Sequence, residues 1–224
     1  MKRWKIVLLL VLGILVLSAT AFTVWQFDNI RAVIKGFTTD YEQIAQEMNQ
    51  NKKSLEDELK KQNIEVVSDF SAEEEKLIIK GELTVEKAVE DLNIKYRETK
   101  KTATDTQNSA ANQLIGEKTV ELYSLKAYYL GQLGQMEKKV KSEYAALPVE
   151  KKNLLGKKDI VNRHMSTALG LMNQCDTKVA EILAELEKEL KKLNTDTSII
   201  QKIRQAYETE KNLKKAYYLS LLEE

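Results

Sequence analysis

The feature that most constrains this chain is an uninterrupted apolar stretch near its beginning, from Ile6 to Trp25, in which no residue carries a charge. A helix of about 20 residues rises roughly 30 Å at about 1.5 Å per residue, which matches the hydrocarbon core of a bilayer. Such a helix closes all its backbone hydrogen bonds internally, as lipid requires. The stretch therefore predicts one transmembrane helix at residues 6–25, preceded by a short tail at residues 1–5.

A cleaved signal peptide is the alternative interpretation of this stretch. The basic start and the small-residue sequence Ala19-Thr20-Ala21 fit a cleavage site. The apolar run continues past that site, however, and Trp25 and Phe27 have the character of interfacial anchors. We therefore favour a retained signal-anchor.

The basic residues around the anchor predict its orientation. Three of them precede the segment, namely Lys2, Arg3 and Lys5, and the nearest that follow are Arg31 and Lys35. Because basic residues stay preferentially on the cytoplasmic side, we expect a single-pass protein of the cell membrane with a cytoplasmic N-terminus. The bulk of the chain would then be extracytoplasmic, with the lipid bilayer as one partner.

Composition favours an all-α fold and excludes several kinds of partner and site. The 224 residues include 35 basic and 34 acidic ones, a net charge of +1, so no strong field attracts nucleic acid. One proline and eight glycines among many Ala, Glu, Lys and Leu residues describe a chain of helix formers. The single cysteine excludes an internal disulfide.

Residues 26–62 are predicted to continue the membrane helix as a helical stalk. Apolar residues recur there at spacings of three and four, which is a heptad seam. Asn51 lies in this seam, where a polar side chain can set the register of a parallel oligomer. The seam is covered either by a second copy of the chain, making a homo-oligomer, or by another helix of the same chain; the pattern alone leaves both open.

Residues 63–112 are predicted to form a short helical hairpin followed by a linker. Ser71 and Glu74 form a capping box that starts a helix ending near Lys80. Gly81 suits the position after that helix, and Thr84 can cap the next one. The polar stretch at residues 99–112 buries almost nothing apolar and is expected to be a linker or a frayed helix.

Residues 113–224 are predicted to form an up-down-up antiparallel three-helix bundle with coiled-coil-like packing. Pro148 ends the first helix, and a turn through Asn153 and Gly156 starts the second. Folding at this turn pairs residues whose numbers sum to about 304, so that one apolar seam meets the other. The same register sets Gly134 opposite Gly170, which suggests that the two backbones approach each other closely there.

A short repeat adds a prediction about tyrosines, because Lys126-Ala127-Tyr128-Tyr129-Leu130 recurs as Lys215-Ala216-Tyr217-Tyr218-Leu219. We expect one core layer to contain Tyr129, Cys175 and Tyr217, simply filling a wide core. The outward tyrosines form a possible aromatic contact patch for a glycan or a partner helix. Its members would be Tyr123, Tyr128 and Tyr218.

No catalytic, cofactor or metal site is predicted. His164 is the only histidine and lies beside the seam, so a histidine-dependent triad or a multi-histidine metal site cannot be built. Cys175 lies at a seam position and reads as a small core residue. The carboxylates are spread along helix faces near lysines, without a pair set apart as acid and base.

These features predict a non-enzymatic, single-pass membrane-anchored protein that presents an extracytoplasmic interaction bundle, as a scaffold, tether or subunit of a cell-envelope complex. One alternative is a secreted module that binds cell-wall glycan after signal-peptide cleavage. Another is a spectrin-like adaptor that faces the cytoplasm. A protein partner is expected in the first case, whereas small-molecule ligands are left open.

Overall fold

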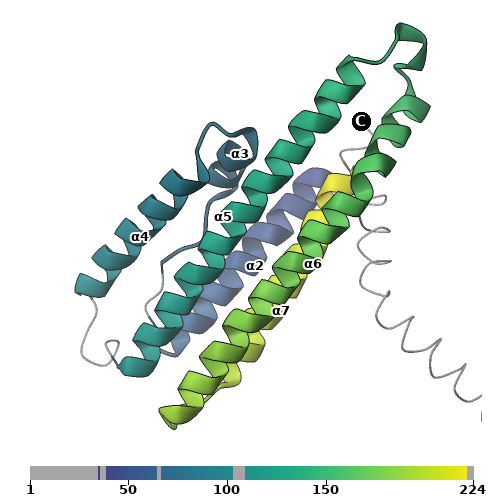
Figure 1. The fold of residues 1–224 in the computed structure, drawn as a ribbon. Helices are drawn as coiled ribbons and strands as arrows, with labels where there is room; N and C mark the ends of the chain where they lie inside the picture. Colours follow the sequence, from purple (N-terminus) through teal and green to yellow (C-terminus); the bar gives the residue numbers. More distant parts are fainter. Residues whose placement is uncertain (1–34, 36–38, 65–66, 103–108, 221–224) are drawn as a thin grey trace, which may run out of the picture. The chain divides into compact units, whose positions relative to one another are not determined.

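The computed structural model describes residue 35 and residues 39–64, 67–102 and 109–220. Throughout these residues the fold is helical, as predicted, with six α-helices and one short 3-10 turn (Figure 1). The elements are α2 (Tyr41–Lys61), α3 (Ala72–Lys80), α4 (Val85–Thr102), α5 (Ala110–Ala145), the 3-10 turn η1 (Val149–Lys151), α6 (Leu154–Lys192) and α7 (Ser198–Ser220).

The predicted membrane anchor at residues 6–25 and the tail at residues 1–5 lie outside the described residues. Among the helices that are described, none combines the length and the apolar character needed to cross a bilayer.

The described chain divides into two compact units. The first joins its residues up to Lys53 with those from Gln205 onward, and the second runs from Ser54 to Arg204.

In the first unit, the prediction of one unbroken helical stalk is wrong at residues 39 and 40, because α2 begins only at Tyr41. Thr39 lies in a bend, and the Asp40 carboxylate accepts a hydrogen bond from the Glu42 backbone N–H at 2.7 Å. Lys35 forms an ion pair with Glu47, whereas 12 residues of straight helix would separate them by about 18 Å. An aspartate that caps a helix therefore outweighs the heptad pattern here.

Helix α7 covers part of the predicted stalk seam. Ile44 of α2 is fully buried in a cluster with Leu213 and Ala216 of α7. The Asn51 side chain donates a hydrogen bond to the Ala206 carbonyl at 2.9 Å. The polar seam residue is thus satisfied within the same chain, which is the second of the two alternatives considered above.

In the second unit, α5 and α6 form a long antiparallel hairpin in the predicted register (Figure 1). The ammonium group of Lys118 lies 2.6 Å from the Glu185 carboxylate, and these two numbers sum to 303. Tyr129 and Cys175, whose numbers sum to 304, are close enough to influence each other electrostatically. Helix α5 ends at Ala145, before Pro148, as the sequence indicates.

The most buried face of α5 is not the seam toward α6 but a second face, which packs against α3 and α4. Many of its residues are small, so they give little hydrophobic signal in the sequence, yet they let other helices approach closely. The buried residues of α5 are Ala111, Ile115, Gly116, Thr119, Val120, Tyr123, Ala127, Leu130 and Gly134.

Glycines on this face explain how the α3–α4 hairpin docks. A Cβ atom on Gly134 would lie 2.0 Å from the Ile79 carbonyl oxygen, and one on Gly131 would lie 2.6 Å from the Val85 side chain. The expected contact between Gly134 and Gly170 is therefore wrong: a Cβ on Gly170 would meet nothing within 4 Å. Gly134 admits the backbone of α3, not that of α6.

The α3–α4 hairpin itself follows its predicted signals. Ser71 and Glu74 form both bonds of the capping box, and Gly81 ends α3 in the left-handed conformation with φ of 74°. The linker is shorter than predicted, since α4 continues to Thr102 and α5 begins at Ala110.

The end of α4 continues in regular helix because its tyrosine is held by α5. Tyr96 donates a hydrogen bond to the Gln113 carbonyl at 3.2 Å. Burial, with the negative charge of Glu117 nearby, raises the pKa of Tyr96 to about 12, so the hydroxyl keeps its proton.

Candidate interaction surface

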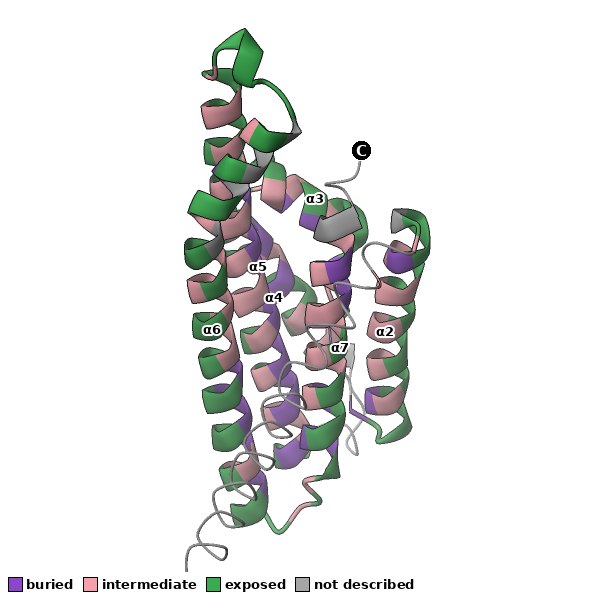
Figure 2. Ribbon diagram, turned by 90° about the vertical axis from the view of Figure 1, so that its right-hand side faces the viewer, coloured by how far each residue is buried: buried purple, intermediate pink, exposed green. Residues whose placement is uncertain are grey.

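The outer part of the α5–α6 hairpin carries an incompletely buried apolar seam. We name residues 135–178 the distal hairpin. Within it, Ile160 is the one described side chain that is buried, and Figure 2 shows this part largely as exposed and intermediate. The seam residues that are half-buried include Met136, Val140, Tyr144, Ala168, Met172 and Cys175. Flexible methionines at such a seam suit an adaptable contact with another helix.

The tip of the distal hairpin, residues 147–158, is ordered by its own hydrogen bonds. The Lys151 backbone N–H donates to the Pro148 carbonyl at 2.9 Å. The Asn153 side chain caps α6 by accepting from the Gly156 N–H at 3.1 Å. A Cβ on Gly156 would lie 2.0 Å from the Lys151 carbonyl oxygen, so only glycine allows this tight return.

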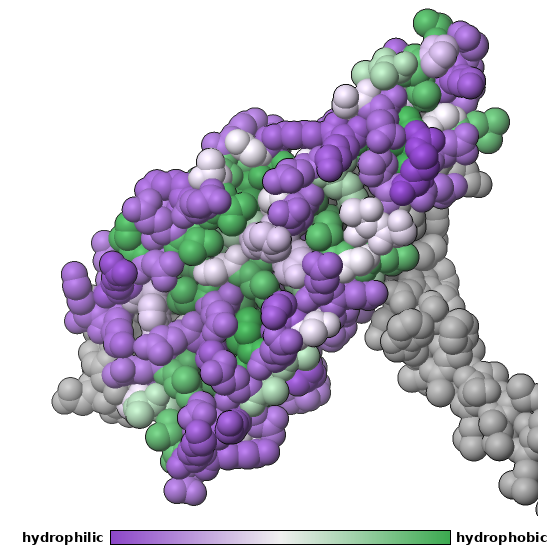
Figure 3. All heavy atoms as spheres, in the orientation of Figure 1, coloured by the Kyte–Doolittle hydropathy of each residue, from purple (hydrophilic) through white to green (hydrophobic). Residues whose placement is uncertain are grey.

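Two aliphatic side chains project into solvent from this ordered tip. Val149 is 84% exposed and Leu155 is 71% exposed. Figure 3 shows hydrophobic spheres at the outer end of the hairpin, among hydrophilic ones. Because single exposed aliphatic residues are common on protein surfaces, their meaning depends on what surrounds them.

Below the tip, the two helices are joined by a polar contact around Glu143. Its carboxylate accepts from Arg163 at 3.0 Å and lies 2.8 Å from His164 Nε2. The hydrogen bond from Arg163, with the contribution of His164, lowers the pKa of Glu143 below its usual value. His164 thus occupies the boundary position expected from the sequence and helps to pair α5 with α6.

The tyrosine residues are only partly arranged as predicted. Tyr128 is 48% exposed and meets the Tyr129 ring edge-on, with centroids 5.2 Å apart. Tyr129 is half-buried beside Cys175, and burial, with the nearby Cys175 and Tyr128, raises the pKa of its hydroxyl. On the hairpin, Tyr129 and Cys175 are thus half-buried neighbours, and Tyr128 lies exposed beside them.

The remaining predicted positions differ in their surroundings. Tyr123 does not join an exposed patch, because it is 8% exposed and lies in the core between α5 and the α3–α4 hairpin. Tyr217 packs, half-buried, against the Ile44 cluster of the first unit. The side chain of Tyr218 lies outside the described part.

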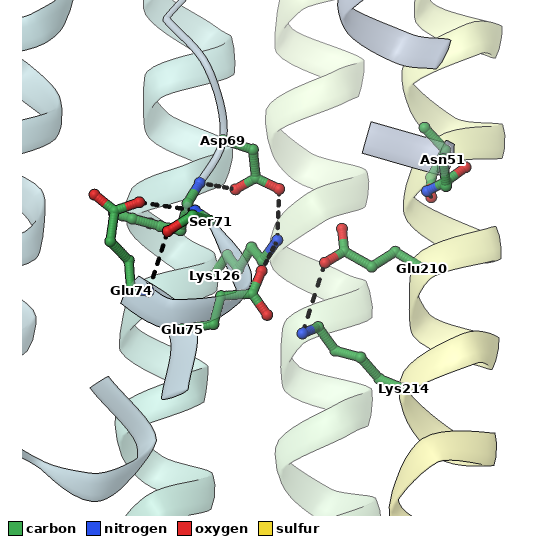
Figure 4. Close-up of polar contacts among 10 residues, drawn as sticks. Asn51, Asp69, Ser71, Glu74, Glu75, Lys126, Glu210 and Lys214 are labelled. Atoms are coloured by element: carbon green, nitrogen blue, oxygen red, sulfur yellow. Dashed lines mark hydrogen bonds and ion pairs between the residues drawn. The ribbon is translucent and has the colours of Figure 1, made fainter. Parts of the chain in front are cut away.

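Sequence reasoning missed a buried ion cluster around Lys126 (Figure 4). The Lys126 ammonium group lies 2.5 Å from the Asp69 carboxylate and 2.7 Å from that of Glu75. The two carboxylates are 4% and 7% exposed, and Asp69 also accepts from the Phe70 N–H at 2.7 Å. Lys126 on α5 thereby binds α3 through Glu75 and the segment before α3 through Asp69.

This cluster is structural in its chemistry. Lys126 supplies positive charge to both carboxylates, as in a buried salt bridge. A catalytic acid and base, in contrast, need surroundings that move their pKa values apart. The available signal was weak: Asp69 and Glu75 flank the capping box of α3, and Lys126 precedes Ala127 on the small-residue face. Figure 4 also shows Glu210 and Lys214, which pair along α7 at 3.7 Å.

A shallow groove also lies between α5 and α6. Its lining is mainly charged, unlike the largely apolar lining of small-molecule sites. The residues are Glu121, Leu125, Lys178, Glu181, Ile182 and Glu185.

Comparisons with protein-family models, curated proteins and solved structures find no match for this chain.

Proposed function

We propose that this chain is a non-enzymatic, single-pass membrane protein that presents the distal hairpin as an interaction arm. In this proposal residues 6–25 hold the chain in the cell membrane and the helical part lies on the extracytoplasmic side. There it acts as a scaffold, tether or subunit of a cell-envelope complex. Its architecture would be an anchor, a helical stalk interrupted before Tyr41, and the α5–α6 hairpin with the helices α3 and α4 packed on it.

The observation that carries this proposal is the unfinished seam of the distal hairpin. Apolar residues recur along both helices, yet the described seam positions other than Ile160 stay half-exposed. Covering such a helix face with a partner is favourable, by roughly 25 cal/mol per Å² of apolar surface buried. The polar clusters around Lys126 and Glu143, in contrast, serve contacts between helices.

Site-specific photo-crosslinking in intact cells tests the role of the seam. A photoreactive amino acid at Met172, on the seam, is compared with one at the exposed Gln174 in the same turn. We expect a discrete crosslinked species from position 172 only. Equal labelling from both positions, or none from 172, would contradict an interaction along the seam.

Mass measurement of the mature N-terminus separates the anchored protein from the secreted glycan-binding module. The proposal requires residues 6–25 to be retained. A mature chain that begins after Ala21 would favour the secreted alternative, in which Tyr128 is the described exposed tyrosine of the aromatic patch. Replacing Tyr128 with serine would then reduce binding to purified cell-wall glycan.

A further inference from the structure

Charge is distributed unevenly within the second unit. The distal hairpin contains nine basic and five acidic residues, a net charge of +4, whereas the rest of residues 54–204 contains 16 basic and 21 acidic ones. The basic character is strongest at the tip, where residues 147–158 include four lysines and one glutamate. The most exposed aliphatic side chains of the unit, Val149 and Leu155, lie in this same segment.

Two lysines of the tip, Lys151 and Lys152, differ from the lysines at the opposite end of α6. There, Lys191 lies 2.6 Å from the Glu187 carboxylate and Lys192 lies 2.7 Å from that of Glu189. Lys151 and Lys152 are exposed, and no described carboxylate forms an ion pair with either. Their charge therefore remains available to a partner outside the chain.

From this arrangement we propose that the tip docks on the surface of an anionic lipid bilayer. Val149 and Leu155 enter the headgroup region, while Lys151 and Lys152 meet lipid phosphate and carboxylate groups. Aliphatic side chains beside lysines are the combination that binds anionic membrane surfaces. The inference rests on the proposed role of the distal hairpin as an exposed arm and adds a lipid contact at its tip, distinct from the partner of the seam.

The construction of the tip supports docking without rearrangement. The Asn153 cap, the bond from Lys151 to the Pro148 carbonyl and the close return at Gly156 hold the loop in one shape. That shape keeps both aliphatic side chains in solvent. A loop that is already ordered loses little conformational entropy on binding, so modest contacts suffice.

Vesicle co-flotation tests the proposal with the full chain reconstituted in phosphatidylcholine nanodiscs. Acceptor vesicles contain phosphatidylcholine alone or a mixture with phosphatidylserine. One variant carries Lys151→Glu with Lys152→Glu, and another carries Val149→Ser with Leu155→Ser. The control removes the same kinds of side chain at the other end of α6, through Lys191→Glu, Lys192→Glu and Leu193→Ser.

We expect wild type and control to dock on the anionic vesicles with similar affinity and to dock poorly on neutral ones. Each lysine near an anionic surface contributes about 1 kcal/mol, so the charge variant should lose about tenfold or more in affinity. The aliphatic variant should also bind more weakly. All four exchanged tip side chains are exposed, so helicity and melting temperature should match wild type.

Three outcomes would overturn the proposal. They are equal docking on neutral and anionic vesicles, tip variants that dock like wild type, and a control that loses as much as the tip variants. The N-terminal segment is common to every protein compared, so differences report on the tip. If docking fails while crosslinks at position 172 persist, the interaction arm stands and the lipid partner is wrong.

Discussion

Gly134 is the residue on which the docking of α3 depends most directly. In Gly134→Ala the new Cβ would lie 2.0 Å from a backbone oxygen of α3, which cannot move without its helix. Overpacking of this kind typically costs about 1–3 kcal/mol. We expect a loss of that size in the free energy of unfolding, measured by urea denaturation at unchanged m-value.

Gly170→Ala is the matched control for that substitution. This glycine also lies inside a long helix, but open space surrounds its Cβ position. Alanine there should stabilise the protein by about 0.5–1 kcal/mol, because glycine carries the larger entropic cost in a helix. Equal effects of the two substitutions would contradict the packing described for α3 against α5.

Lys126 is predicted to stabilise the fold through its two buried carboxylate partners. Lys126→Met leaves two nearly buried carboxylates without their shared lysine, and breaking a buried ion pair typically costs about 3–5 kcal/mol. The triple variant that adds Asp69→Asn and Glu75→Gln should recover part of this loss. Urea unfolding compares the two variants, and a triple variant no more stable than Lys126→Met would rule out a shared cluster.

Among the helices, α3 is the shortest α-helix of the described chain and depends most on its cap. Burial of Glu74 raises its pKa, but the Ser71 backbone N–H, Lys95 and the Ser71 hydroxyl together outweigh this and lower the pKa below 4.5. The stabilisation from ionised Glu74 is therefore complete above about pH 4.5 and lost as the pH falls through the lowered value.

Two variants test this cap. Ser71→Ala should cost about 1 kcal/mol at neutral pH, the usual effect of removing a helix N-cap. Glu74→Gln keeps a side chain that can complete the capping box, yet it should flatten the dependence of stability on pH below about 4.5. Thermal unfolding from pH 3 to 7 measures both effects; an unchanged acid slope in Glu74→Gln would refute the role given to this carboxylate.

The sequence was informative wherever a local signal determined an element. The Ser71 capping box, Gly81 and Pro148 mark helix ends that the structure confirms, whereas α6 begins at Leu154, inside the turn predicted through Asn153 and Gly156. The α5–α6 register was also predictable, because two apolar seams joined by a short turn can meet in only one way. The start of α2 at Tyr41 differs from the prediction because the heptad pattern runs through this position, whereas the Asp40 carboxylate caps the helix there.

Contacts distant in sequence were not predictable. The small residues of the buried α5 face, such as Gly116 and Ala127, carry little hydrophobic signal. Nothing local indicates that Lys126 meets Asp69, which lies 57 positions earlier. In the candidate surface, the sequence does not predict that Val149 and Leu155 are exposed, because an apolar residue near a turn can be either buried or exposed.

At the scale of the whole molecule, the proposed function combines a membrane anchor at residues 6–25 with a hairpin whose basic and apolar tip makes a second contact. A tether needs these two contacts and no catalytic site. The described helices form a core in the second unit and a separate cluster in the first, built from Ile44, Leu213 and Ala216.

Protease protection measures on which side of the cell membrane the helical part of the chain lies. Cells that express the chain with a C-terminal tag are treated with protease after their outer layers are permeabilised, with the cell membrane left intact. With the helical part on the extracytoplasmic side, we expect the tagged full-length protein to disappear while a cytoplasmic marker survives. Survival of the tag until the cell membrane is lysed would contradict the account and place the helical part in the cytoplasm.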